Sequence, residues 1–585
     1  MYLKKSKSGS LKAQRTFYDQ RLSIFFCGFV LLFAGLIVRL FHLYFFPPAS
    51  ENLKKVASNQ YHKSIKLSPY RGTIYDRKGI PLAISIRSPS VAINPRAFHP
   101  TSDQISDISR LLRIKVSSLE GLSKREAYFS WVKRKVGTNL EKHLADLKIP
   151  GLHILTEPAR FYPSSGSASH IIGQVNIDDK GQSGIESLMD RHLRGENLSL
   201  QLSTDARGKL IFLHSSSAKP EESGHDVHLT IDLAIQEIVD EALERGVKNA
   251  KAHSGFAMVA DPHSGQILAI ANFQNQESDK ESAPSLRNKA ILDLFEPGSI
   301  IKPLVISQAI DQNLVTTEDL IDCENGRLAI PGGAIHDDHP AKVISVAETI
   351  VHSSNICSYK IASLLGKEGL NLALRHFGIG SKDLTLGFQS EHTGRIPNWQ
   401  GWQEMRFANI AFGQGLVVKG LEMLQAYSSI ANGGYLFQPY IVNKVVSGTG
   451  AIVKAFEPKH TNRVLQASTA RQMREILHRV TLEGTGTQAK TQFYTVAGKT
   501  GTAQKVDPIL KIYSPDKRIA NFIGFSPAFD PHIAVFVVID EPQRKPYYGG
   551  LWAAPVFREI AEKTLRYLNV APDIPNGRFQ KEVRS

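Results

Sequence analysis

Three short strings in the second half of this 585-residue chain carry the residue types of one acyl-transfer site. They are Ser299-Ile-Ile-Lys302, Ser353-Ser354-Asn355 and Lys499-Thr500-Gly501-Thr502. Each string alone is weak evidence, because such short patterns also occur in ordinary helices, turns and strands. They follow one another with 54 residues from Ser299 to Ser353 and 144 from Asn355 to Lys499, and the three together are stronger evidence than any one of them.

The first string predicts a nucleophile and its base. Glu296-Pro297-Gly298 places Ser299 at the start of a helix, where the helix N-terminus favours a developing negative charge. Lys302 lies three residues on and therefore shares a helix face with the serine. A desolvated lysine amine is neutral enough to take the proton of the serine hydroxyl.

The other two strings predict groups that handle the substrate. Ser353 can relay a proton to a leaving amine, and Asn355 can hold a peptide carbonyl and the lysine. The third string reads as an edge strand that pairs with an extended peptide. We expect Lys499 to act in catalysis and Thr500, Gly501 and Thr502 to bind substrate, a terminal carboxylate included. The backbone N–H groups of Ser299 and Thr502 are the expected oxyanion hole.

The elements that must position these strings indicate an α+β domain with an antiparallel sheet between helices. Apolar runs on either side of Asp261-Pro-His-Ser264 and of Pro527-Ala-Phe-Asp-Pro531 predict two hairpins. A further strand is expected over 494–502, and residues 302–480 are expected to be mostly helical. This domain is predicted to span 226–570, beginning with a strand at Val227 and a helix capped by Asp232.

The preceding residues, 47–225, are expected to form an irregular, β-rich pedestal. Residues 71–83 alternate around an Asp-Arg pair and a glycine turn, which predicts a hairpin, and helical periodicity is confined to 102–147. Further arginines and carboxylates cluster at 181–186 and 204–208. We expect buried arginine–carboxylate pairs there to hold the fold together rather than to catalyse.

Residues 22–46 are predicted to be an uncleaved transmembrane anchor that follows a cytoplasmic tail of residues 1–21. The apolar run from Leu22 to Val38 is near the lower length limit for a spanning helix, and Phe41–Phe46 can extend it. Six basic residues against Asp19 precede the run, which predicts that the N-terminus stays in the cytoplasm and that everything after Pro47 lies outside. Residues 571–585 are predicted to be a loose polar tail.

Charge, cysteines and metal-like clusters exclude several other functions. The net charge of +15 is diffuse, without an aromatic-basic stripe, so no nucleic-acid partner is expected. Cys27 lies in the predicted span, which leaves Cys323 and Cys357 as the pair that could form a disulfide. We favour free buried thiols, because a large hydrophobic core is stable without a disulfide. The donors of His336-Asp337-Asp338-His339 are adjacent rather than convergent, so we expect a polar loop, no metal and no cofactor.

Together with the three strings, several further motifs make the chain resemble a class B penicillin-binding protein. These are Arg71-Gly72…Asp76-Arg77…Gly79, Gly184-Ile185-Glu186, Phe295-Glu-Pro-Gly-Ser299, Ala431-Asn-Gly-Gly434, Gly484-Thr-Gly486 and Gly498-Lys-Thr-Gly-Thr-Ala-Gln504. The resemblance covers almost everything after the N-terminal tail. Asn355 makes the chain more similar to the division-specific transpeptidase than to the elongation enzyme, which in many diderm bacteria has aspartate there. One departure is Val417-Val-Lys-Gly420-Leu, which replaces a threonine-proline turn.

The resemblance implies a peptidoglycan D,D-transpeptidase of the bacterial inner membrane. Ser299 would attack the D-Ala-D-Ala bond of a stem peptide, release D-alanine and pass the acyl group to an amine on a neighbouring strand. β-Lactams would acylate the same serine. A separate polytopic glycosyltransferase and other division proteins are the expected partners, because no glycosyltransferase domain precedes the pedestal. Arg39 in the membrane helix is a possible contact.

Other functions remain as alternatives. A lateral-wall transpeptidase would have the same strings, and so would a D,D-carboxypeptidase or a β-lactamase, although a lactamase gains nothing from a large pedestal. A β-lactam sensor would need an output domain larger than 21 residues before the membrane. An inactive scaffold would tolerate the loss of Ser299 or Lys302, and both are present.

Overall fold

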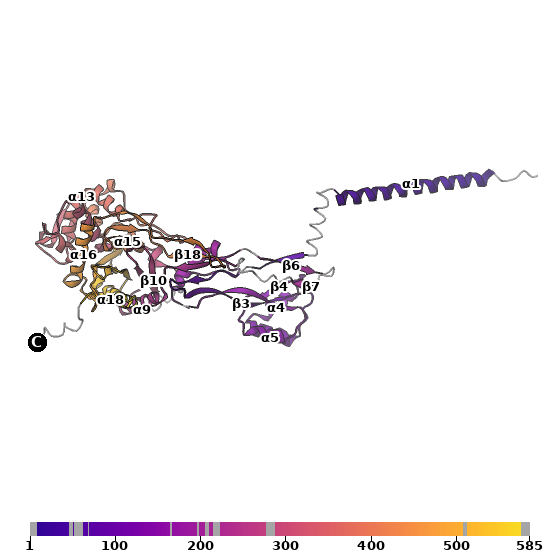
Figure 1. Ribbon diagram of the computed structural model, residues 1–585, viewed down its shortest axis with the longest axis horizontal. Helices are drawn as coiled ribbons and strands as arrows, with labels where there is room; N and C mark the ends of the chain where they lie inside the picture. Colours follow the sequence, from indigo (N-terminus) through magenta and orange to yellow (C-terminus); the bar gives the residue numbers. More distant parts are fainter. Residues whose placement is uncertain are drawn as a thin grey trace, which may run out of the picture. The chain divides into compact units, whose positions relative to one another are not determined.

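The computed structural model of the chain describes residues 9–45, 51, 62–67, 70–163, 166–195, 198–204, 210–213, 223–275, 287–506 and 512–574 (Figure 1). It divides into two compact units. The first comprises the described residues up to Leu67, Glu126–Tyr128 and those described between Asn197 and Ser217, and the second comprises the rest. Most of the predicted cluster at 204–208 and most of the predicted tail lie outside the described residues.

The first unit contains one long helix and a small sheet. Helix α1 spans Gly9–Phe45, and its stretch Arg21–Phe45 has a mean hydropathy of 2.5, which is long and apolar enough to cross a membrane. The helix begins well before the apolar run, because the lysine, glutamine and arginine residues there also favour helix. The sheet is antiparallel in the order β1-β6-β7, with bounds His62–Leu67, Leu198–Thr204 and Leu210–Leu213.

The second unit begins with a twisted seven-stranded sheet in the order β19-β18-β8-β2-β3-β4, with β5 paired to β3. The predicted hairpin at 71–83 is confirmed, because Asp76 accepts the N–H groups of Lys78 and Ile80 and so closes the turn between β2 and β3. The strand bounds are Ile74–Tyr75 (β2), Pro81–Ile93 (β3), Ser130–Lys133 (β4), Leu152–Phe161 (β5), Asp226–Leu229 (β8), Val442–Val446 (β18) and Ile452–Ala455 (β19).

Short helices accompany this sheet. Three fall within the predicted helical stretch at 102–147 and pack around their own apolar cluster. The helix bounds are Ser102–Leu112 (α3), Val116–Ser123 (α4), Leu140–Asp146 (α5), Ser169–Ile172 (α6), Gly184–Leu188 (α7) and Asp190–Leu193 (α8).

Two strands of this sheet come from a part of the sequence that was expected to be mostly helical. Strands β18 and β19 form a hairpin, and β18 pairs with β8. The expectation of mostly helical structure over 302–480 is therefore wrong at this hairpin. The pairing partner of β18 lies some two hundred residues earlier, and no local pattern identifies it.

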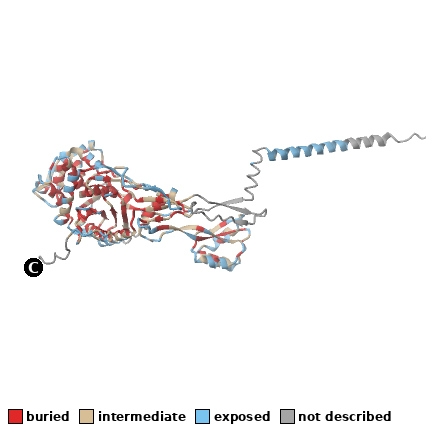
Figure 2. Ribbon diagram, viewed as in Figure 1, coloured by how far each residue is buried: buried red, intermediate tan, exposed pale blue. Residues whose placement is uncertain are grey.

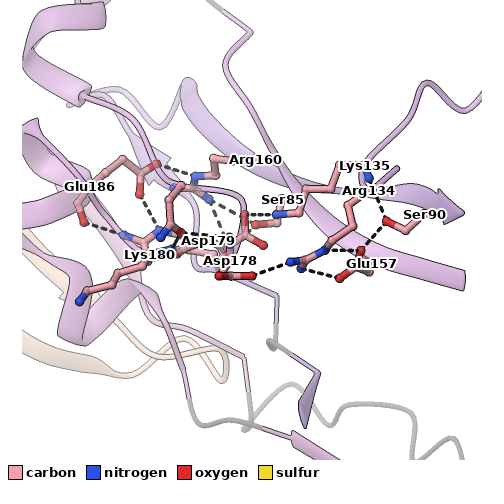
Figure 3. Close-up of polar contacts among 12 residues, drawn as sticks. Ser85, Ser90, Arg134, Lys135, Glu157, Arg160, Asp178, Asp179, Lys180 and Glu186 are labelled. Atoms are coloured by element: carbon pink, nitrogen blue, oxygen red, sulfur yellow. Dashed lines mark hydrogen bonds and ion pairs between the residues drawn. The ribbon is translucent and has the colours of Figure 1, made fainter. Parts of the chain in front are cut away.

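Buried arginine–carboxylate pairs hold this part together, as predicted (Figure 3). Glu186 accepts Arg71 Nε at 2.5 Å on one oxygen and Arg160 Nε at 2.6 Å on the other, with all three side chains at most 1% exposed. Arg71 also donates to the carboxylate of Asp190 at 2.7 Å and to the backbone carbonyl of Asp179 at 3.0 Å. The cluster thus ties the strand of Arg160 and the turn before β2 to helices α7 and α8.

The second sheet is five-stranded and antiparallel, in the order β10-β9-β23-β22-β21. The two predicted hairpins are confirmed as β9–β10 and β22–β23. The last strand begins at Ala497 rather than near 494, because Tyr494 is held in a turn by Thr491. The strand bounds are Ser254–Ala260 (β9), Ile267–Gln274 (β10), Ala497–Val506 (β21), Tyr513–Ser526 (β22) and Ile533–Asp540 (β23).

The interior of the part that holds this sheet is buried (Figure 2), and the two faces of the sheet pack into two apolar clusters. On β9, Met258 packs into one apolar cluster while Ala257 and Val259 pack into another, as alternation along a strand requires. Helices α9 and α18 cover the second face. Helix α9 begins after Asp232, whose side chain accepts the N–H groups of Ala234 and Ile235, which confirms the predicted cap.

Most of the other helices pack into the first cluster, and the bounds of all helices and short strands of this part, α9 and α18 included, are given together. The helix bounds are Leu233–Asn249 (α9), Lys289–Leu292 (α10), Gly298–Ile301 (the 3-10 helix η2), Lys302–Asp311 (α11), Val346–Val351 (α12), Asn355–His376 (α13), Glu404–Ala411 (α14), Gly420–Ala431 (α15), Ala467–Leu482 (α16), Gly549–Trp552 (α17) and Ala554–Tyr567 (α18). Antiparallel two-stranded pairs are Leu294–Phe295 with Val418–Lys419 (β11, β16), Leu320–Asp322 with Val343–Ser345 (β12, β15), Arg327–Ile330 with Gly333–His336 (β13, β14) and Tyr435–Phe437 with His460–Arg463 (β17, β20).

We expect Glu186→Gln to lower the free energy of unfolding by about 3–5 kcal/mol, because it removes the carboxylate that pairs with the buried Arg160 and leaves Arg71 with Asp190 alone. The midpoint of urea unfolding of the detergent-solubilised chain measures this. Asp107→Asn is the matched control, since its pair with Arg110 is largely exposed and contributes little. Equal midpoints for the two variants would contradict a structural role for the cluster.

Candidate active site

Ser299 stands at the beginning of the continuous helical segment η2–α11, as the sequence predicts. The turn before it requires glycine, because Gly298 has φ +62° and a Cβ there would lie 2.9 Å from the carbonyl oxygen of Thr502. The Gly298 N–H donates to Gly413 at 2.9 Å, and the Tyr427 hydroxyl donates to Ile300 at 2.8 Å. These contacts fix the serine, which is half-buried, against strand β21.

Lys302 is fully buried one turn beyond the serine. Its Nζ donates to the carbonyl oxygen of Ser353 at 2.5 Å and lies 3.1 Å from the Ser353 hydroxyl. Burial lowers the pKa of the Lys302 amine to about 7, although Asp337 and Asp338 oppose the shift. Close to neutral pH, a large fraction of this amine is therefore unprotonated and able to accept a proton.

Ser353 has a backbone conformation that residues with a side chain rarely adopt. Its φ is +64°, in the left-handed region, which costs on the order of 1 kcal/mol or more. The next residue, Ser354, caps helix α13 by accepting the Cys357 N–H at 3.0 Å. This turn aims both oxygen atoms of Ser353 at Lys302.

Asp337 is the functional residue that the sequence reasoning missed. One carboxylate oxygen accepts the N–H groups of Asn355 (2.5 Å) and Ile356 (3.1 Å), and the other accepts the Ser354 hydroxyl at 2.6 Å. The sequence reasoning treated it as part of a polar loop because the donors around it are adjacent in the sequence. Its partners lie 17 to 19 residues away, where no local pattern identifies them. Among the described residues, no group of three or more His, Cys, Asp or Glu could hold a metal ion.

The side chain of Asn355 bonds to the loop before helix α13 rather than to Lys302. Its amide nitrogen donates to the carbonyl of His336 at 2.8 Å, while the lysine bonds to Ser353 instead. The amide oxygen makes no hydrogen bond within the described part of the chain. It is therefore free to accept an N–H group of a ligand.

Cys323 and Cys357 form a disulfide, so the expectation of free thiols is wrong. Their Cα atoms are 5.2 Å apart. Cys357 lies in the first turn of α13, and Cys323 follows β12, whose pairing with β15 brings it beneath that turn. Only this tertiary arrangement brings the two thiols within bonding distance. The bond adds a covalent restraint to the turn that carries Ser353 and Asn355.

Strand β21 is at the edge of its sheet, as predicted, and carries the third string. Lys499 is fully buried, and its pKa is lowered well below the usual value by burial and by the nearby Lys302. The Thr500 and Thr485 hydroxyls are 2.7 Å apart, and Thr502 accepts the N–H of Gly549 at 3.2 Å.

Gly501 lets this strand approach the serine. A Cβ at Gly501 would lie 2.2 Å from the Asn521 side chain and 3.0 Å from that of Ile300, the residue after Ser299. All three strings therefore meet around Ser299. The arrangement contains a nucleophile with a buried amine one turn away, and a strand edge beside both.

Comparison with known proteins agrees with this geometry. A family model described as the penicillin binding protein transpeptidase domain matches residues 255–562, and one described as the penicillin-binding protein dimerisation domain matches residues 66–229. The probable peptidoglycan D,D-transpeptidase PenA of Neisseria meningitidis is 31% identical over 563 residues, which cover 95% of this chain and 94% of the relative. The peptidoglycan D,D-transpeptidase FtsI of Escherichia coli is 31% identical over 559 residues, covering 94% and 92%. Penicillin-binding protein 3 of Mycobacterium tuberculosis, solved with aztreonam, superposes with a TM-score of 0.67 at 26% identity and covers 87% of this chain and 99% of that structure.

We expect the rate at which benzylpenicillin acylates Ser299 to rise with pH up to about 7 and to level off above it. Only the neutral Lys302 amine accepts a proton, so the rate falls about tenfold per unit below that pH. Asp337→Asn removes a negative charge that favours the ammonium form, so its midpoint should move to lower pH. Stopped-flow acylation between pH 5 and 9 measures both, with the exposed Asp530→Asn as control. A flat profile, or an upward shift in Asp337→Asn, would contradict this role for Lys302.

Replacing both disulfide cysteines by serine should lower the free energy of unfolding by about 3–4 kcal/mol, the loop-closure estimate for a separation of 34 residues. It should also slow acylation of Ser299, because α13 loses a restraint on its first turn. Thermal unfolding and acylation rates measure the two effects. Cys27→Ser, which removes the free cysteine, is the control. Wild-type values in the double variant would exclude a role for the bond.

Proposed function

The chain belongs to the class B penicillin-binding proteins, and from that premise we propose how its own residues carry out the reaction. It is a peptidoglycan D,D-transpeptidase that works through a serine acyl-enzyme. The observation that carries the assignment of roles is the buried Lys302 amine, which lies one turn after Ser299 and bonds to Ser353. Such an amine serves as a base only where its ammonium form is destabilised.

In the first half-reaction, Ser299 Oγ attacks the carbonyl carbon of the D-Ala-D-Ala bond while Lys302 takes its proton. The backbone N–H groups of Ser299 and Thr502 bind the oxyanion that forms, and the contact of Gly298 with the Thr502 backbone supports this pairing. Ser353 passes the proton from Lys302 to the leaving nitrogen. D-Alanine leaves, and an ester joins the stem peptide to Ser299.

In the second half-reaction, an amine of a neighbouring stem peptide attacks the ester carbonyl. Its proton passes through Ser353 and Lys302 to Ser299 Oγ as the ester bond breaks. The new amide cross-links two strands, and the enzyme is regenerated. The free amide oxygen of Asn355 is suited to accept a backbone N–H of the bound peptide.

The donor peptide binds along the edge of strand β21. Its terminal carboxylate lies at Lys499, Thr500 and the neighbouring Thr485 hydroxyl, and its backbone pairs with Gly501 and Thr502. The buried Lys499 amine lies beside the Thr500 hydroxyl and can donate an N–H group to that carboxylate. Because the same contacts suit the carboxylate of a β-lactam, such drugs acylate Ser299 in place of the stem peptide.

The enzyme works at the division septum, anchored in the inner membrane by α1. The N-terminus lies inside and the catalytic domain outside, which the basic residues before the apolar stretch of the helix support. A polytopic glycosyltransferase and division-complex proteins are its partners. The similarity to FtsI over 94% of this chain supports the septal role over lateral-wall synthesis.

Intact-mass analysis of the detergent-solubilised chain with benzylpenicillin tests the nucleophile and the reaction type. We expect a long-lived adduct on the wild type, and acylation at least about a thousandfold slower in Ser299→Ala. Ser363→Ala, on the exposed side of α13, is the control and should acylate normally. An adduct on Ser299→Ala would exclude this nucleophile, and rapid release of the adduct would favour a hydrolase instead.

A further inference from the structure

A cleft of about 540 Å³ lies next to the proposed peptide site. Glu296, three residues before Ser299, lines it together with Gly415. Arg375, at the end of α13, and Arg395 line it from other parts of the chain. We call this space the arginine cleft. No step of the proposed mechanism uses its two guanidinium groups.

The walls of the arginine cleft are held in place by buried hydrogen bonds. Glu422 accepts the N–H groups of Gly380 (3.2 Å) and Gly394 (2.8 Å), both of which line the cleft. The backbones of Arg395 and Val417 bond to each other in both directions, at 2.7 and 3.1 Å. The cleft is therefore formed before any ligand arrives, which reduces the entropic cost of binding.

The cations of the cleft retain free donors. Within the described part of the chain, the Arg395 side chain makes no hydrogen bond or ion pair. Arg375 uses only its Nε, which donates to Asn371 at 3.0 Å, so its two terminal nitrogens are available. Two guanidinium groups with free N–H donors suit a carboxylate, which accepts paired hydrogen bonds from such groups.

Glu296 does not neutralise these cations. No ion pair within the described residues joins it to either arginine. One of its oxygens accepts the Gly415 N–H at 3.0 Å and the Tyr513 hydroxyl at 3.1 Å. The other is buried without a partner and can accept an N–H of the same ligand.

The direction of the bound peptide leads to this cleft. With the terminal carboxylate at Lys499–Thr500 and the scissile carbonyl at Thr502, the upstream residues continue toward Val506. Val506 is paired with Tyr513, whose hydroxyl donates to Glu296. The four steps along the strand from Thr502 to Val506 span roughly 13 Å, the length of a few peptide residues.

We propose that the arginine cleft is a subsite for a carboxylate carried by the side chain of a stem-peptide residue upstream of the scissile bond. This inference rests on the proposed function, because that function sets the peptide direction. Arg375 and Arg395 bind the carboxylate, and Glu296 accepts an N–H beside it. The subsite thereby selects stem peptides that have an acidic upstream side chain over those that have a neutral one.

Matched probes test the subsite on the full-length chain in detergent. The first pair is a penicillin with an adipoyl side chain, which ends in a carboxylate, and its terminal carboxamide. The second pair is two stem peptides that differ only in a side-chain carboxylate or carboxamide at the third residue, used as competitors of benzylpenicillin acylation. For the penicillins the readout is the acylation rate of the acidic probe divided by that of the neutral probe. For the stem peptides it is the same quotient of their strengths as competitors. Changes in Ser299 reactivity cancel in both ratios.

We expect a ratio of about ten in the wild type for both pairs, falling to about one in Arg375→Gln and in Arg395→Gln. Arg395→Lys keeps the positive charge but loses the paired N–H donors of the guanidinium group, so its ratio should lie between those of the wild type and Arg395→Gln. Arg406→Gln, an exposed arginine on α14, is the matched control and should keep the wild-type ratio.

Each other outcome overturns a defined claim. A wild-type ratio near one, or a ratio that survives both glutamine variants, overturns the subsite while leaving the proposed function intact. A ratio seen only with the penicillins overturns the assignment to stem peptides. If benzylpenicillin does not acylate the wild-type chain at all, the proposed function fails and the subsite fails with it.

Discussion

The burial of the Lys302 amine is the constraint on which the rest of the site depends. An ammonium ion without solvent is costly, and among the residues that the structure describes only Ser353 forms a hydrogen bond with this amine. Deprotonation removes most of that cost, so the same burial that threatens stability also favours the neutral amine, the form in which we propose that Lys302 acts as the base. Lys302 in turn helps burial to lower the pKa of Lys499, which lies close by.

The hydrogen-bond partner of Lys302 must have a fixed position for this role. That partner is Ser353, a residue in a strained backbone conformation. Ser353 would relax out of the left-handed region if its turn were free. Three hydrogen bonds to Asp337 and a disulfide from Cys357 hold the residues that follow it. The cost of the strained turn is thus offset by contacts outside the turn itself.

The serine side of the site depends on close backbone packing. Gly298 and Gly501 leave no room for a Cβ, which lets the turn before Ser299 and strand β21 touch. Farther away, β18 joins β8 in the sheet that also carries β2 and β3. The domain that carries Ser299 therefore contributes a strand to the same sheet that the Arg71–Glu186 cluster borders. The buried ion cluster stabilises this shared sheet.

The sequence by itself determined the features that depend on neighbours along the chain. The helix start at Ser299, the cap at Asp232 and the hairpin around Asp261–Ser264 are local, because turn residues and side-chain periodicity act over a few positions. The spacing of the three strings was also enough to identify them as one site. Tertiary structure alone decided the Cys323–Cys357 bond, the three contacts of Asp337, the pairing of β18 with β8 and the meeting of Arg375 with Arg395. Each of these depends on which distant residues come within a few ångströms, and the packing of the whole chain sets those distances.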